Sequence, residues 1–126
     1  MTLDAATNRQ PQPGLWIFTG KHFSIVRVNS EKPRPNLSAA EESIASTAEL
    51  LAVYGNALTA MSGTYELAGD RLTTRAIVAT RNGPMSPGSF QTLSFTLDSA
   101  TLVLTNAATN QGAVANPTTW KLVRLE

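Results

Sequence analysis

Short runs of apolar and β-branched residues, separated by turn-forming residues, recur along most of the chain. Residues 15–19 form an aromatic and β-branched run that stops at Gly20, and residues 22–28 alternate in polarity. Later runs of the same kind cover residues 61–67, 71–80, 89–97, 101–105 and 118–125. Runs of this length, bounded by Gly, Pro, Asn and Asp, predict the strands of an antiparallel sheet.

One segment has the period of a helix instead. Ser38 and Glu41 have the spacing of a capping box, in which each side chain accepts a hydrogen bond from the backbone N–H of the other residue. Gly55 is a typical residue for a helix end. An apolar stripe at helical spacing comprises Ile44, Ala48, Leu50, Leu51, Tyr54 and Leu58. The pattern predicts one amphipathic helix that packs its apolar face on the sheet or across a barrel mouth.

The order of these elements predicts the fold class. Strands follow one another through tight turns at 69–70 and 98–99, and the pattern contains no β–α–β alternation. This organisation favours an all-β (mainly β) protein, an antiparallel β-barrel of about seven strands with one helix inserted after the second strand. We expect the 126 residues to form a single domain over 14–126, preceded by an irregular lead-in over 1–13.

Several stretches also match a family pattern. They are Pro-Gly-Leu-Trp-Ile-Phe-Thr-Gly-Lys-His-Phe-Ser at 13–24, Ser-Gly-Thr-Tyr-Glu at 62–66, Leu-Thr-Thr-Arg at 72–75 and Trp-Lys-Leu-Val-Arg at 120–124. In this order they resemble the bacterial lipocalin-like domain family over residues 11–126. The resemblance implies a calycin-type β-barrel, a fold that hosts carriers as well as some cyclases, isomerases and decarboxylases.

One part of the family pattern is missing. The family usually begins with a strand of the form Gly-x-Trp-x-Leu, whereas residues 1–12 contain no Trp and little β-propensity. An unfilled sheet edge exposes backbone N–H and C=O groups that can pair with another chain. The strand at 15–19 carries no charge that would blunt such pairing. We therefore expect a homodimer, the alternative being that the lead-in folds back and covers the edge.

Composition excludes several classes of function. A net charge of +1 with scattered basic residues argues against nucleic-acid binding. The absence of cysteine and the single histidine argue against a metal site, and no cofactor motif is present. No apolar run reaches the length of a membrane span, and the N-terminus does not have the pattern of a secretory signal. These features predict a cytoplasmic protein.

Strand alternation predicts which residues face the interior of the barrel. Because burial of charge is costly, Lys21 and Arg27 are expected to point outward. Their strand then sends into the lumen His22, Ser24, Val26 and Val28. The later strands send inward Met61, Gly63, Tyr65, Gln91, Leu93, Phe95, Leu97, Trp120 and Leu122. The candidate ligand-binding residues are Ser24, Tyr54, Met61, Gln91, Phe95 and Trp120.

Three functions are compatible with this interior. The favoured one is a barrel that binds a small hydrophobic or aromatic molecule in its lumen. The second is a cofactor-free enzyme, a cyclase, isomerase or hydratase, in which His22 and Tyr65 act as acid and base groups. In the third, the same side chains fill a solid barrel, and the protein is a structural or interaction domain.

Overall fold

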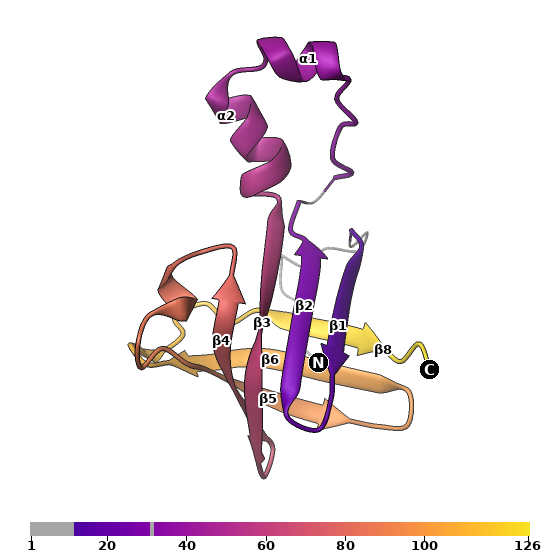
Figure 1. Cartoon of the computed structure of the whole chain (residues 1–126). Coiled ribbons are helices and arrows are strands. Elements are labelled where there is room, and N and C mark those ends of the chain that lie inside the picture. Colours follow the sequence, from indigo (N-terminus) through magenta and orange to yellow (C-terminus); the bar gives the residue numbers. More distant parts are fainter. Residues whose placement is uncertain (1–11, 31) are drawn as a thin grey trace. The chain divides into compact units, whose positions relative to one another are not determined.

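The computed structural model describes residues 12–30 and 32–126 (Figure 1). Strands account for 48% of these residues and helices for 16%, which makes the protein mainly β. The strands are β1 (Gly14–Phe18), β2 (His22–Val28), β3 (Leu58–Ala68), β4 (Arg71–Ala79), β5 (Gln91–Leu97), β6 (Thr101–Thr109), β7 (Gly112–Ala113) and β8 (Thr119–Val123). Most of the predicted lead-in, residues 1–13, lies outside the described residues.

The strands form one sheet in the order in which they occur along the chain. The order is β1-β2-β3-β4-β5-β6-β7, and β8 also pairs with β6. The pairings from β3 onward are antiparallel, which confirms the predicted antiparallel sheet with a helical insertion after the second strand. The largest differences from the predicted bounds are that β3 begins earlier, at Leu58, and that β6 continues to Thr109, into a stretch expected to be a loop, where it pairs with the unpredicted β7.

Contacts between residues divide the chain into two compact units. The first unit contains the described residues of 12–16, 25–30 and 32–60, and the second unit contains 17–24 and 61–126. Strands β1, β2 and β3 each contribute residues to both units, so the units are not consecutive segments of the chain. Each unit is described by itself below.

The helical insertion of the first unit consists of three short pieces rather than one helix. They are α1 (Ala39–Ile44), α2 (Thr47–Leu50) and a π-helical turn (Leu51–Gly55) (Figure 1). The predicted capping box is confirmed, because the Ser38 hydroxyl accepts from the Glu41 N–H at 3.2 Å and the Ser38 N–H donates to the Glu41 carboxylate.

The prediction of one continuous helix is wrong, because a second capping box interrupts it. The backbone of Ala45 is extended, and Ser46 begins α2 by accepting from the Glu49 N–H at 3.2 Å. Serine competes for backbone hydrogen bonds inside a helix and is favoured at its start, so the chain ends one helix and begins another here. Leu58, expected on the helical stripe, is the first residue of β3.

Polar contacts connect the loops of the first unit. The Asn29 N–H donates to the Ala57 carbonyl at 2.7 Å, and the Asn29 side-chain amide donates to the Thr59 hydroxyl at 2.7 Å. The Arg34 guanidinium donates to the Val53 carbonyl at 3.4 Å, where it meets the end of the helical insertion. The buried apolar side chains of this unit are Ile25, Val53 and Ala57.

Two hairpins set the register of the second unit. The β3–β4 turn consists of Gly69 and Asp70, and Gly69 has a φ of 61°, as a hairpin turn with glycine at its first central position requires. After β5, the Asp98 carboxylate accepts from the N–H groups of Ala100 and Thr101 at 2.9 and 2.7 Å. These turns fix which side chains lie opposite each other on neighbouring strands.

The sheet of the second unit changes direction within β4. A bulge between Ser62 and Gly63 shifts the β3–β4 register, and β4 pairs with β5 only over residues 71–74. Gly63 is required at the bulge, because a Cβ there would lie 1.9 Å from the Arg75 carbonyl oxygen. The β4–β5 pairing ends at Thr74 and Gln91 because β5 begins at Gln91.

The buried face of β2 is the opposite of the predicted one. Phe23 is 2% exposed and Ile25 is also buried, whereas Val26 is 53% exposed and His22 is exposed. The prediction that His22 and Val26 point inward is therefore wrong. Burial of a phenylalanine and an isoleucine is worth several kcal/mol. That gain exceeds the cost of leaving Arg27 half-buried on the same face, since a long side chain can extend its charged end toward water.

Candidate functional site

One row of polar side chains crosses three strands of the second unit. Tyr65 on β3 lies opposite Thr74 on β4, and Thr74 lies opposite Gln91 on β5. Residues directly opposite each other in a sheet point to the same face, with Cβ atoms about 5 Å apart. Thr74 is the buried polar side chain of the described residues, and its hydroxyl reaches the Gln91 carbonyl at 3.5 Å. The row lies at the first residue of β5.

Apolar rows occupy the same face beside this polar row. Leu72 lies opposite Leu93, and both are buried. Further along β5, Phe95 lies opposite the fully buried Leu104, which in turn lies opposite Trp120 on β8. Phe95 and Trp120 are half-buried. The inward orientation predicted for Gln91, Leu93, Phe95 and Trp120 agrees with this arrangement.

The Tyr65 side chain is fixed by its neighbours in the second unit. Its hydroxyl donates to the Thr19 carbonyl, and its ring meets Phe18 edge-on at a centroid distance of 5.4 Å and an angle of 84°. The Tyr65 N–H also donates to the Lys21 carbonyl at 3.1 Å. The phenol therefore holds the β1–β2 turn against β3, and the proton of its hydroxyl is already engaged.

The other predicted residues of the second unit are not assembled around Tyr65. His22 is exposed, and the contact it makes in the β1–β2 turn is through its backbone, whose carbonyl accepts from the Thr19 N–H at 2.8 Å. Within the described chain no contact joins the imidazole to the Tyr65 phenol. The Ser24 hydroxyl pairs with the Ser62 hydroxyl at 2.9 Å, and Met61 is half-buried opposite Ala79.

Tyr54 lies in the first unit, apart from the other predicted ligand-binding residues. It is exposed on the π-helical turn, and its hydroxyl donates to the Glu42 carboxylate of α1. This hydrogen bond to a carboxylate is the main cause that raises the pKa of Tyr54 above its ordinary value. Tyr54 and Glu42 belong to a groove of about 660 Å³ lined by Ala39, Glu42, Ser43, Thr47, Leu50, Leu51, Tyr54 and Gly55.

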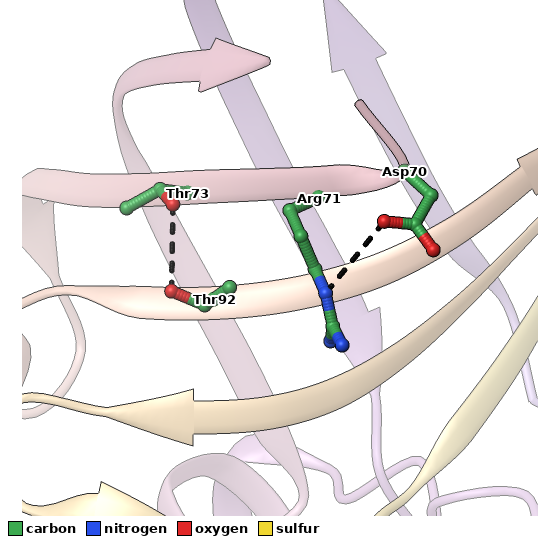
Figure 2. Close-up of polar contacts among 4 residues, drawn as sticks. All are labelled: Asp70, Arg71, Thr73 and Thr92. Atoms are coloured by element: carbon green, nitrogen blue, oxygen red, sulfur yellow. Dashed lines mark hydrogen bonds and ion pairs between the residues drawn. The ribbon is translucent and has the colours of Figure 1, made fainter. Parts of the chain in front are cut away.

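The opposite face of the β4–β5–β6 sheet is rich in hydroxyl groups. Figure 2 shows Thr73 and Thr92 facing each other across β4 and β5, with their hydroxyl oxygens 3.4 Å apart. Arg71 projects from the same region and forms an exposed ion pair with Asp70 at 3.8 Å. Such an exposed pair contributes little to stability. Nearby, the Arg75 guanidinium lies 5.4 Å from the Phe90 ring centroid.

Burial affects one cation of the first unit. The guanidinium of Arg27 is partly removed from water on the buried face of β2, and this desolvation lowers its pKa.

The described residues contain no group of three His, Cys, Asp or Glu side chains that could hold a metal ion. In the same part of the chain, no helix is long and apolar enough to span a membrane. The cytoplasmic location stays a prediction.

No family model, curated protein or solved structure matches this chain. The resemblance to the bacterial lipocalin-like domain family stays a prediction from the sequence.

Sequence reasoning missed Thr74 and Leu104, although a signal was present for each. A two-residue turn at 69–70 puts Tyr65 opposite Thr74, and the short loop after Leu97 puts Phe95 opposite Leu104. Glu42 was not among the candidate residues. Its partner, Tyr54, comes into reach only because the helix breaks, which the second capping box could have indicated.

Proposed function

We propose that the protein binds a small apolar or aromatic molecule on the core-facing side of the sheet in the second unit. The observation that carries the proposal is the polar row of Tyr65, Thr74 and Gln91 beside an apolar wall that includes Phe95 and Trp120. Sites for small molecules combine mostly apolar and aromatic walls with a few polar groups that fix the orientation of the ligand.

In this proposal the aromatic residues supply binding affinity, and the polar residues orient the ligand. The half-buried rings of Phe95 and Trp120 offer apolar area to a ligand at little cost in conformational entropy. The Gln91 side chain carries both a donor and an acceptor, so it can orient a ligand carbonyl or hydroxyl. Because the Tyr65 hydroxyl donates to the Thr19 carbonyl, its remaining capacity toward a ligand is that of an acceptor.

Catalysis has less support than binding. A cyclase, isomerase or hydratase would need His22 and Tyr65 to converge on one substrate, yet His22 is exposed and the Tyr65 proton is engaged with the backbone. We therefore favour a binding protein. A structural or interaction domain remains the alternative if the sheet face accepts no ligand.

Titration with an apolar naphthalene-based fluorescent probe tests the proposal. We expect saturable binding that is weakened about tenfold by Trp120→Ala, because the loss of ring contacts removes roughly 1–3 kcal/mol. Lys121→Ala is the matched control, since Lys121 follows on the same strand but is exposed on the other face. Circular dichroism checks that both variants are folded. Equal affinities of the two variants, or no saturable binding, would contradict the proposal.

We further propose that the protein forms a homodimer through β1. Among the strands of residues 12–30 and 32–126, β1 stands at the end of the order, and Leu15 and Ile17 are both exposed on it. An apolar edge strand without charged residues favours pairing with an equivalent edge of a second chain.

Sedimentation at micromolar concentration tests the dimer. We expect a mass of twice 13.4 kDa for the native chain, and a monomer for Ile17→Lys, because a charged edge residue opposes pairing. Leu97→Lys is the control: Leu97 is also an exposed apolar residue, 70% exposed against 51% for Ile17, but it lies on β5, away from the end of the strand order and opposite Leu102 of β6. A native chain that sediments as a monomer would refute this part of the proposal.

A further inference from the structure

The groove of the first unit has the size of a small-molecule site and a distinct chemistry. Three elements line it: α1 contributes Glu42, α2 contributes Leu50, and the π-helical turn contributes Leu51 and Tyr54. Its volume of about 660 Å³ lies within the range of ligand pockets, roughly 300–1,000 Å³, but the groove is open to solvent, since every lining residue except Leu50 is exposed. The groove exists because the insertion bends at Ala45 and Ser46, which brings the π-helical turn back to α1.

Glu42 is the charged residue of the groove lining. The two other glutamates of the helical insertion serve the caps: Glu41 accepts from the Ser38 N–H, and Glu49 accepts from the Ser46 N–H. Glu42 instead accepts from the Tyr54 hydroxyl. A carboxylate has about four lone-pair positions, so this single contact leaves most of its capacity for a further donor.

The surrounding charge favours a cation. Residues 34–56 contain three glutamates and one cation, Arg34, whose guanidinium contacts the Val53 carbonyl and acts electrostatically on Tyr54; their formal net charge is therefore −2. The apolar part of the lining comes from Leu50, Leu51 and the ring of Tyr54. An aromatic face beside a carboxylate attracts an ammonium group by two electrostatic contributions, ion pairing and the ring quadrupole.

We propose that this groove binds a small organic amine, an arylalkylammonium ion. Its ammonium group donates to the Glu42 carboxylate beside the Tyr54 ring, and its apolar tail lies along Leu50 and Leu51. This site is independent of the ligand proposed for the sheet of the second unit.

The test uses 4-phenylbutylamine with the full-length chain, observed by ¹⁵N-resolved nuclear magnetic resonance. We expect saturable shifts confined to residues 39–55. Glu42→Gln should weaken binding roughly tenfold, the effect of losing a hydrogen bond to a charged group. The control, Glu66→Gln, removes the same charge from an exposed position on β3 and should leave the affinity unchanged. Added salt should weaken binding of the amine, because it screens an ion pair at an open groove.

Two further probes distinguish an amine site from a general apolar surface. The neutral 4-phenylbutanol and the anionic 4-phenylbutyrate share the aromatic tail, and we expect each to bind at least tenfold more weakly than the amine. Equal binding of the alcohol, or an unchanged affinity in Glu42→Gln, would overturn the proposal. Concentration-dependent shifts at 39–55 without any probe would also overturn it, since a second copy of the chain would then be the occupant.

Discussion

Strands β2 and β5 are both seven residues long, yet their patterns define their buried faces with very different certainty. On β5 the apolar side chains occupy one face, including Leu93 and Phe95, and the other face carries Thr92, Ser94 and Thr96. The buried face of β5 therefore follows from the pattern alone.

On β2 both faces carry apolar residues, so the pattern leaves the choice open. Phe23 and Ile25 lie on one face, and Val26 and Val28 lie on the other. The position of Arg27 then suggests that its own face is exposed, which is wrong, because Phe23 is almost fully buried. The comparison teaches that the size of the apolar side chains decides the face when a single long cation opposes them.

The largest expected effect is that of truncating the buried phenylalanine of β2. Phe23→Ala should lower the free energy of unfolding by about 3–5 kcal/mol, because it removes apolar contacts and leaves a cavity. Val26→Ala, on the exposed face of the same strand, should lower it by less than about 1 kcal/mol. Urea denaturation measures both. A larger loss for Val26→Ala would restore the predicted orientation of β2.

The corresponding pair on β5 sharpens the comparison. Leu93 is 2% exposed and Leu97 is 70% exposed, although both lie on the same face of the strand. Leu93→Ala should cost about 2–5 kcal/mol and Leu97→Ala less than about 1 kcal/mol. Urea denaturation of the two variants decides whether burial ends before the end of the strand. Similar losses would mean that the core extends to the β5–β6 turn.

Much of the fold could be predicted because local signals and sheet pairing agree. The bounds of β2, the start of β4 at Arg71 and the start of β6 at Thr101 follow from alternation ended by turn residues. The extra length of β6 could not be predicted. Its last residues, Ala108 and Thr109, pair with the short β7, and a two-residue partner leaves no periodicity of its own.

The candidate site was harder to predict than the strands that carry it. Alternation placed Gln91, Phe95 and Trp120 on one face, but the proximity of Tyr54 to Glu42 depends on a helix break and a π-helical turn. The stripe of apolar residues predicted over 44–58 indicates a helical period without showing where the helix bends. Contacts that depend on such a bend therefore cannot be predicted from the periodicity of apolar residues.

An intermediate effect is expected from the caps of the helical insertion. Ser46→Ala and Ser38→Ala should each cost about 0.5–2 kcal/mol, because each removes the acceptor for an N3 N–H. Ser46→Ala has a second consequence, since it removes the residue that begins α2 and holds the bend. Thermal denaturation measures the first effect, and chemical shifts of residues 45–55 measure the second. If the shifts respond equally to both substitutions, Ser46 does not determine the bend.

The smallest expected effect concerns the turn that follows β5. The N–H groups of Ala100 and Thr101 donate to the Asp98 carboxylate and hold its pKa below the ordinary value. Since the charged form is favoured in the folded chain, its contribution to stability is present above the ordinary pKa of about 3.9. That contribution is lost as the pH falls through the lower pKa of the folded state. Asp98→Asn should therefore destabilise the protein at pH 7, and the difference from the native chain should shrink as the pH is lowered below about 4. Thermal denaturation across this range measures the difference; a constant difference would show that the carboxylate charge does not stabilise the turn.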